Sequence, residues 1–468
     1  MDLLCTKSAT ELAELIRSKK VSSKEVIEAH LARIEEVNPQ VNAVTMILNE
    51  SALIEAEKAD ASSEEERNRP LHGVPFTVKE NIDLMGTPTT DGVPSRKNVM
   101  PKQNSPIVDR MVAAGAIPIG RTNLPELGMR LDTDNPLRGR TFNPWDRTLT
   151  PGGSSGGEAA AIATGMSPFG LGNDIGGSVR NPAYCCGIAS LKPSIGRVPF
   201  VSSIEPVDIG IPGLFLSDGP MARSVNDLRI GLSVLSGRHL QDPQSLDVPL
   251  DGKIPDKLTA ALVVEIEGYE IASSTRAEIK RAGRILADRG WRVEEVEAPE
   301  IKRVNEVWGK IINIGGLGTE LIKDIVKPET FAYFKQVGEI FDDPLLSLEE
   351  AIVERRRLRR LWSAFLTDYT VCIGPTWTNL PWPIDTDLDP KEGIHALRKS
   401  FQFITPGNAL GLPSVALPTG VSDRLPTGIQ IYADLYREDL CFLASEIIER
   451  ESKCPTPIDP KQGQDSAL

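Results

Sequence analysis

A glycine-rich segment that carries serines is the part of this sequence best suited to chemistry. It begins Thr150-Pro-Gly-Gly-Ser-Ser-Gly-Gly-Glu158 and is followed by Asp174-Ile-Gly-Gly-Ser-Val-Arg180. Because glycine has no Cβ, the backbone N–H groups of such a run can point together at a ligand. A serine among these donors supplies a nucleophile, with donors placed where negative charge develops on a carbonyl oxygen. The segment therefore predicts a serine-based acyl-transfer site.

A phosphate-binding loop is one alternative for the same glycines. Gly152 and Gly157 have the spacing of that motif, but Glu158 and Ala159 stand where lysine and a hydroxyl residue are required. An acidic residue at this point would repel phosphate, so the sequence disfavours this interpretation.

A nucleophile elbow with a Ser-His-Asp triad is the second alternative, because Gly152 to Gly156 fits its G-x-S-x-G pattern. Such an elbow follows an apolar strand, and residues 143–151 do not form one. The only histidines further along the chain, His239 and His395, lie in polar surroundings. This interpretation is disfavoured as well.

A lysine offers the base that histidine does not. Lys79 closes an apolar stretch, Leu71 to Val78, that predicts a buried strand. Such a lysine is usually a surface residue whose stem covers apolar neighbours. A buried lysine would instead have a pKa lowered from about 10.4 toward the range of a general base. Local sequence leaves both interpretations open.

Taken together, these motifs resemble the signature of the amidase-signature hydrolases. The match is strongest from Leu71 to Val198, where it also includes Leu191-Lys-Pro193, and weaker similarity covers most of the remaining chain, including 401–432. The resemblance implies a single α/β/α domain with a central mixed, twisted β-sheet. It also implies a Ser–cis-Ser–Lys triad, in which Lys79 is the base, Ser154 the cis-peptide serine and Ser178 the nucleophile. The two serines are 24 positions apart, the spacing that this family keeps.

The resemblance assigns further site residues. The implied oxyanion hole consists of the backbone N–H groups of Ile175, Gly176, Gly177 and Ser178. The implied supporting residues are Ser155, a hydrogen-bonding neighbour, with Asp174 and Arg180 as positioning groups. Glu80 and Asn173 stand where many relatives carry aspartate and threonine, which leaves substrate preference open rather than catalysis.

The elements that must position these residues alternate in the manner of an α/β protein. Helices are predicted at 8–37 (two of them), 52–61, 105–115, 275–290, 303–326, 347–369 and 437–450. Strands are predicted at 71–82, 116–120, 187–191, 258–265, 291–296, 371–374, 414–417 and 428–431. No linker divides the chain, so we predict one domain over 1–468, with the signature core at about 71–200 and a loose tail at about 454–468.

Composition excludes several classes of protein. The net charge of −13 over 468 residues argues against a nucleic-acid surface. Six scattered cysteines and four histidines contain no zinc motif, so neither a metal nor an organic cofactor is expected. No apolar run approaches the roughly 18 residues of a membrane span, and a signal-peptide core is lacking. We therefore predict a cytoplasmic protein, with its oligomeric state open, a homodimer included.

The predicted function is hydrolysis of a small-molecule amide through an acyl-enzyme. Carbamates, anilides and esters stay open as related substrates. One alternative keeps the fold but changes the role: the glutaminase subunit of an aminoacyl-tRNA amidotransferase, which needs partner subunits for activity. A non-enzymatic binding protein is disfavoured, because Lys79, Ser154 and Ser178 are all present.

Overall fold

One large sheet forms the centre of the protein. The computed structural model describes residues 1–203, 211–314, 322–341, 343–452 and 454–461, and within these ranges eleven strands form a single sheet. Their order across the sheet is β1 (Val44–Ile47), β3 (Ile117–Thr122), β2 (Pro75–Lys79), β4 (Phe169–Asp174), β6 (Ser217–Ala222), β5 (Ala189–Lys192), β10 (Ser414–Ser422), β11 (Leu425–Tyr432), β9 (Val371–Gly374), β7 (Thr259–Leu262) and β8 (Arg292–Glu295).

The sheet is mixed, as the sequence predicted. Strand β2 is parallel to both of its neighbours, β3 and β4, and β7 is parallel to β8 and β9. The other pairs are antiparallel. Because β2 and β4 are adjacent and parallel, their carboxyl ends open at the same edge of the sheet. Lys79, at the end of β2, and Asp174, at the end of β4, therefore lie at the same edge of the sheet.

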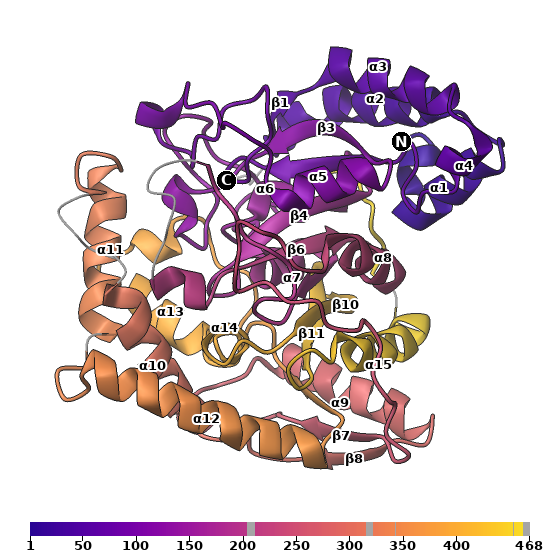
Figure 1. Cartoon of the computed structure of the whole chain (residues 1–468). Coiled ribbons are helices and arrows are strands. Elements are labelled where there is room, and N and C mark those ends of the chain that lie inside the picture. The colour runs from indigo at the N-terminus through magenta and orange to yellow at the C-terminus, as the bar shows by residue number, and fades with distance from the viewer. Residues whose placement is uncertain (204–210, 315–321, 342, 453, 462–468) are drawn as a thin grey trace.

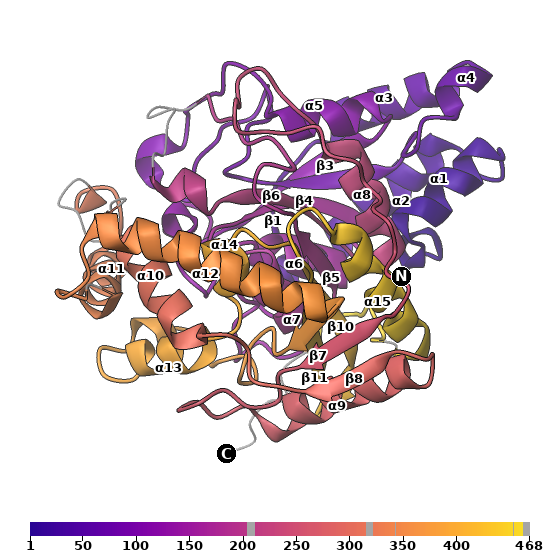
Figure 2. The ribbon, with the colours of Figure 1, turned by 60° about the horizontal axis from the view of Figure 1, so that its bottom comes forward.

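Helices cover both faces of the sheet (Figures 1 and 2). One apolar cluster packs against the sheet through α1 (Ala9–Arg17), α5 (Pro106–Ala113), α8 (Val225–Leu235), α9 (Ser273–Ala287) and α15 (Glu438–Glu451). A second cluster contains α2 (Ser23–Val41), α3 (Asn49–Asp60), α6 (Gly156–Ala163) and α7 (Arg180–Cys186). The short α4 (Glu64–Arg67) buries no residue. The predicted α/β/α class is confirmed.

A third apolar cluster gathers the helices of the second half of the chain. It contains residues of α10 (Ile301–Ile314), α11 (Pro328–Phe341), α12 (Leu348–Asp368), α13 (Gly393–Ser400) and α14 (Pro406–Ala409). Helices α10, α11 and α12 lie together in both views, in the salmon and orange part of the chain (Figures 1 and 2). Helix α10 contacts the loop from Ile175 to Ser178, as described below.

Most predicted elements are present with shifted ends, but three predictions need correction. The helix expected at 303–326 is α10, which covers 301–314, and residues 315–321 lie outside the described ranges. Strands β1, β4 and β6 were not predicted; for β4 and β6 the reason is that Gly170, Gly172 and Pro220 are unusual inside strands.

The third correction concerns the C-terminal tail, which is not loose over residues 454–461. Ile458 N–H donates to Ala163 O at 2.9 Å, and Lys461 N–H donates to Pro144 O at 2.9 Å. Arg33 Nη2 also bonds to Asp459 at 2.7 Å. Polar composition therefore misled the prediction, since backbone bonds and a buried arginine hold this segment.

Candidate active site

Lys79 ends strand β2 with its side chain fully buried. The strand lies between β3 and β4, and all five of its residues are buried, so the interpretation of Lys79 as a surface residue is wrong. Its Nζ lies 2.7 Å from Ser154 Oγ and 2.7 Å from Asn173 Oδ1. The ammonium or amine group therefore has one hydroxyl and one amide oxygen within hydrogen-bond distance.

The pKa of Lys79 is lowered to about 7 from its ordinary value of 10.5. Burial is the main cause, because it disfavours the charged form, while the carboxyl groups of Asp174 and Asp218 act in the opposite direction. At neutral pH a large share of the protein therefore holds Lys79 as the neutral amine, the form that accepts a proton.

Ser154 lies in the turn that leads into α6, and the Gly153–Ser154 peptide bond is cis. Glycine is required before it, because a Cβ at Gly153 would lie 2.3 Å from Arg130 O. The cis bond agrees with what the resemblance implied for this serine. The Ser154 hydroxyl faces Lys79 at the distance given above.

Ser178 lies between the end of β4 and the start of α7, with 7% of its surface exposed. Its carbonyl accepts a hydrogen bond from Ser155 N–H at 3.1 Å. This bond ties the two serine-bearing turns together. The Ser155 hydroxyl itself is buried and has no partner within the described part of the chain.

The loop from Ile175 to Ser178 contains the four backbone N–H groups that were predicted to form an oxyanion hole. Gly177 has φ 110°, which favours glycine, but its N–H donates to Asp174 Oδ1 at 2.7 Å. Asp174 Oδ2 accepts from Val179 N–H at 3.1 Å. For Ile175, Gly176 and Ser178, no partner of the N–H is found in the described ranges. Within the described ranges these three N–H groups are therefore free, whereas the Gly177 N–H is occupied. We call residues 175–178 the oxyanion loop, after the role that the sequence analysis predicted for them.

Arg180 locks the aspartate that holds this loop. Its Nε and Nη2 each lie 3.0 Å from a carboxylate oxygen of Asp174, and both side chains are fully buried. The guanidinium keeps the pKa of Asp174 far below its usual range despite burial. Arg180 also donates to Ile404 O and to Asn408 Oδ1, both at 2.6 Å. This geometry is the one expected of positioning groups behind the loop.

Two buried acids near Lys79 were missed by the sequence analysis. Asp218 on β6 is the cross-strand partner of Asn173, and its Oδ1 has no hydrogen-bond partner among the described residues. Burial raises the pKa of Asp218 to about 8. Glu158 accepts from Thr77 and from Thr122, and burial raises its pKa to about 7. Glu158 was visible in the signature, but no motif marks Asp218.

Aromatic side chains line the outer side of the oxyanion loop. Trp308 Nε1 donates to Ile175 O at 3.2 Å, and a Cβ at Gly176 would lie 2.9 Å from the Trp308 ring and 3.2 Å from Phe401. The rings of Trp308 and Phe401 lie 5.4 Å apart. An aromatic wall therefore stands next to Gly176 of this loop. These residues come from the second half of the chain and carry no local signature.

The two downstream histidines lie outside this arrangement. His239 accepts from Gln241 N–H at 3.3 Å in a partly exposed turn, and His395 is an exposed residue of α13. If lysine is the base, His239→Ala and His395→Ala should each keep kcat/KM within about tenfold of the wild type, which corresponds to about 1.4 kcal/mol. Steady-state kinetics on an amide substrate test this, and a loss of about 10³-fold or more would indicate a Ser-His mechanism.

One acidic cluster lies where a cation site would be considered. Asp132, Asp385 and Asp387 lie close together. Arg130 bonds to Asp387 at 2.9 and 3.0 Å, and Arg140 bonds to Asp132 and Asp385. These carboxylates are neutralised by arginines, so the cluster is an ion-pair network.

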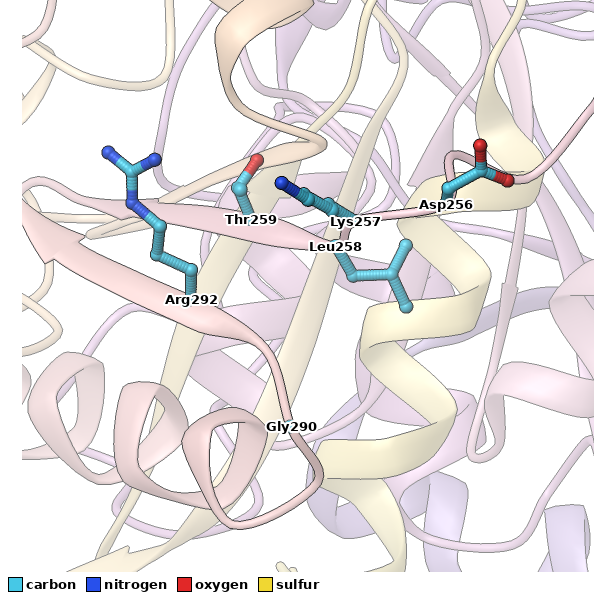
Figure 3. Close-up of a pocket in the computed structure, with 6 residues that line it drawn as sticks. All are labelled: Asp256, Lys257, Leu258, Thr259, Gly290 and Arg292. Atoms are coloured by element: carbon cyan, nitrogen blue, oxygen red, sulfur yellow. The ribbon is translucent and has the colours of Figure 1, made fainter.

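A pocket at the far edge of the sheet contains none of the predicted catalytic residues (Figure 3). It is formed by β7, β8 and the segments that precede them, and its lining residues are Asp256, Lys257, Leu258, Thr259, Gly290 and Arg292. Strands β7 and β8 stand at the other end of the sheet from β2. This pocket therefore does not belong to the site at Lys79.

Known proteins resemble this chain over nearly its whole length. Indoleacetamide hydrolase of Bradyrhizobium diazoefficiens is 38% identical over 454 residues, which cover 95% of this chain and 86% of the relative. The structure of 6-aminohexanoate cyclic dimer hydrolase superposes with a TM-score of 0.82 at 27% identity and covers 99% of both chains. One subunit of the glutamyl-tRNA(Gln) amidotransferase of Enterococcus faecalis is 28% identical over 509 residues, covering 96% of this chain and 97% of the relative.

The fold and these matches define an amide-bond hydrolase. The family model described as Amidase matches residues 25–442, and the chain belongs to this family. The predictions of the family, of the fold and of an enzyme acting on carbon–nitrogen bonds other than peptide bonds are confirmed. The amidotransferase relative is a more distant match than the hydrolase. Within the described ranges, no helix combines the length and the apolar character needed to cross a membrane.

Proposed function

We propose that this enzyme hydrolyses small arylacetamides through an acyl-enzyme on Ser178. The observation that carries the chemistry is the buried Lys79 amine, 2.7 Å from Ser154 Oγ. Two findings support the aromatic acyl group: the similarity to an indoleacetamide hydrolase, and the wall of Trp308 and Phe401 beside Gly176. Aromatic groups bind favourably against such rings.

In the proposed first half-reaction, neutral Lys79 takes the proton of Ser154 while Ser154 takes the proton of Ser178. The Ser178 oxygen attacks the amide carbon, and the negative charge on the carbonyl oxygen is held by the N–H groups of Ile175, Gly176 and Ser178. The C–N bond then breaks. The leaving nitrogen receives a proton from Lys79 through Ser154, and ammonia or an amine departs.

Water completes the cycle. The same relay removes a proton from water, the resulting oxygen attacks the acyl-ester carbon, and the bond to Ser178 breaks. The Ser178 oxygen regains its proton and the carboxylic acid leaves. Asn173 supports both halves, because its Oδ1 accepts one N–H of Lys79 at 2.7 Å. That bond orients the amine so that its lone pair can face Ser154.

The setting of the enzyme is also part of the proposal. All six cysteines are free thiols and five of them are buried, which fits a reducing compartment such as the cytoplasm. The net charge of −13 disfavours nucleic acid as a partner. A dissolved small amide is therefore the expected ligand. A homodimer stays a prediction.

A hydrolysis screen with the isolated chain tests the substrate class. Indoleacetamide and phenylacetamide should show kcat/KM at least about tenfold above aliphatic amides, because burying an aromatic ring contributes more than about 1 kcal/mol. Anilides, carbamates and glutamine serve as comparison substrates. Glutamine as the best substrate would favour the amidotransferase role instead, and equal rates for aryl and alkyl amides would contradict an aromatic pocket.

A further inference from the structure

The segment Leu124–Arg130 passes directly beside Ser154. A Cβ at Gly128 would lie 3.5 Å from Ser154 Oγ and 3.4 Å from Asn81 Nδ2. Gly128 and Leu127 both have left-handed backbone, with φ of 65° and 54°. The backbone of this segment thus forms one wall of the site beside Ser154.

A buried carboxylate fastens this segment to a distant helix. Glu126 is fully buried, and its Oε1 accepts from Lys327 N–H at 2.8 Å. Its Oε2 accepts from the hydroxyl of Thr330, which is also fully buried. Both donors belong to the N-terminal end of the 14-residue helix α11. The N-terminus of a helix carries partial positive charge and free donors, so it stabilises a buried carboxylate. We call this pair of bonds the Glu126 clamp.

The other end of the same segment is fastened nearby. Arg130, which is 1% exposed, bonds through Nε and Nη2 to Asp387 in the short helix η6 (Thr386–Leu388). The segment is therefore held on both sides of Gly128 by buried polar contacts.

The helix that receives the clamp is also joined, through α10, to the loop that carries Ser178. Asn313 of α10 donates to Gly338 O of α11 at 3.0 Å. On the same α10, Trp308 rests against Gly176 and donates to Ile175 O in the oxyanion loop. Helices α10 and α11 thus contact both the segment beside Ser154 and the loop that carries Ser178.

We infer that the Glu126 clamp is a positioning device that sets the width of the acyl-group site. Glu126 acts through the backbone of Leu127 and Gly128, and neither Glu126 nor Thr330 takes part in proton transfer. This inference rests on the proposed function, because it assigns the clamp to the fit of the aryl group. Breaking it should loosen the wall without disturbing Lys79.

Thr330→Val tests the clamp with almost no change in volume. We expect KM for indoleacetamide to rise about tenfold with kcat within about threefold, since uniform binding is lost while the relay is intact. Thr330→Ser keeps the hydroxyl and should restore KM. Glu126→Gln should raise KM by a similar factor. The double variant should raise KM little further than either single variant, because both changes weaken the same contact.

Ser347→Ala is the matched control. Ser347 caps α12 through its hydroxyl, so its loss weakens a neighbouring helix without touching the site. It should leave KM unchanged. If Thr330→Val and Ser347→Ala lower the melting temperature alike and neither moves KM, Thr330 is merely structural and the inference is overturned. A fall in kcat on every substrate with KM unchanged would overturn it as well.

Hydrogen–deuterium exchange gives a readout that needs no substrate. In Thr330→Val, the N–H groups of Leu127, Gly128 and Met129 should exchange faster than in the wild type, and in Thr330→Ser they should not. Unchanged exchange in Thr330→Val would overturn the clamp even if the enzyme preferred another substrate. A wild type that rejects arylacetamides while the exchange responds as expected would instead contradict the proposed substrate and uphold the clamp.

Discussion

Replacing Ser178 with alanine is expected to lower kcat for amide hydrolysis by about 10⁴- to 10⁶-fold, the range seen when a serine nucleophile is removed. The reason is that Ser178 supplies the oxygen that forms the acyl-enzyme in the proposed mechanism, and an alanine methyl group cannot replace it. The fold should not change, because alanine fits the same backbone and Ser178 binds its neighbours through the main chain. Steady-state kinetics with circular dichroism of the purified variant measure both effects.

Covalent labelling provides the control for this prediction. A phosphonyl fluoride should modify Ser178 in the wild type and no serine in Ser178→Ala, as read by peptide mass spectrometry. Modification of Ser154 or Ser155 would contradict the assignment and favour the nucleophile elbow. A Ser178→Ala variant that keeps more than about one hundredth of the wild-type kcat would contradict it too.

Lys79, Ser154 and Ser178 could be named from the sequence because each lies in a short motif, and their catalytic roles stay predictions. The glycines of the signature serve close backbone approaches, as at Gly153, where a Cβ would meet Arg130 O at 2.3 Å. Two other glycines made part of the fold hard to predict. Gly170 and Gly172 weaken the strand pattern of β4, yet a Cβ at Gly170 would lie 1.9 Å from Glu158 Oε1. Glycine is therefore needed at these two positions because buried polar side chains lie close to β4, although glycine disfavours a strand.

Other features of the site depend on contacts between distant segments, which one sequence does not reveal. Trp308 meets the oxyanion loop across 133 positions, and Glu126 meets Thr330 across 204. Asp218 reaches the neighbourhood of Lys79 only through its pairing with Asn173 on β4. The Gly177 N–H is a further case. The motif does not distinguish the four loop residues, but in the structure Asp174 accepts a hydrogen bond from the N–H of Gly177.

Lys79→Met is expected to remove most amide hydrolysis and to spare activated esters. An amide nitrogen leaves only when it is protonated through Ser154, whereas a good phenoxide leaves without a proton, so the loss should be at least about 10²-fold larger on the amide. In the wild type, kcat/KM should fall about tenfold per pH unit below about 7, because Lys79 becomes charged there. In Lys79→Met that acidic limb should disappear. A pH–rate profile on a matched amide and ester measures all three effects.

One further variant and a stability measurement separate the base from a structural lysine. Lys79→Arg should not restore activity, because a guanidinium stays protonated in proteins. The pKa of Lys79 is lowered in the folded protein, so its cost to folding is complete below about pH 7 and fades as the pH rises toward 10.5, the ordinary value. The difference in unfolding free energy between Lys79→Met and the wild type should therefore shrink over that interval. If amide and ester lose activity equally and the acidic limb persists in Lys79→Met, Lys79 is not the base.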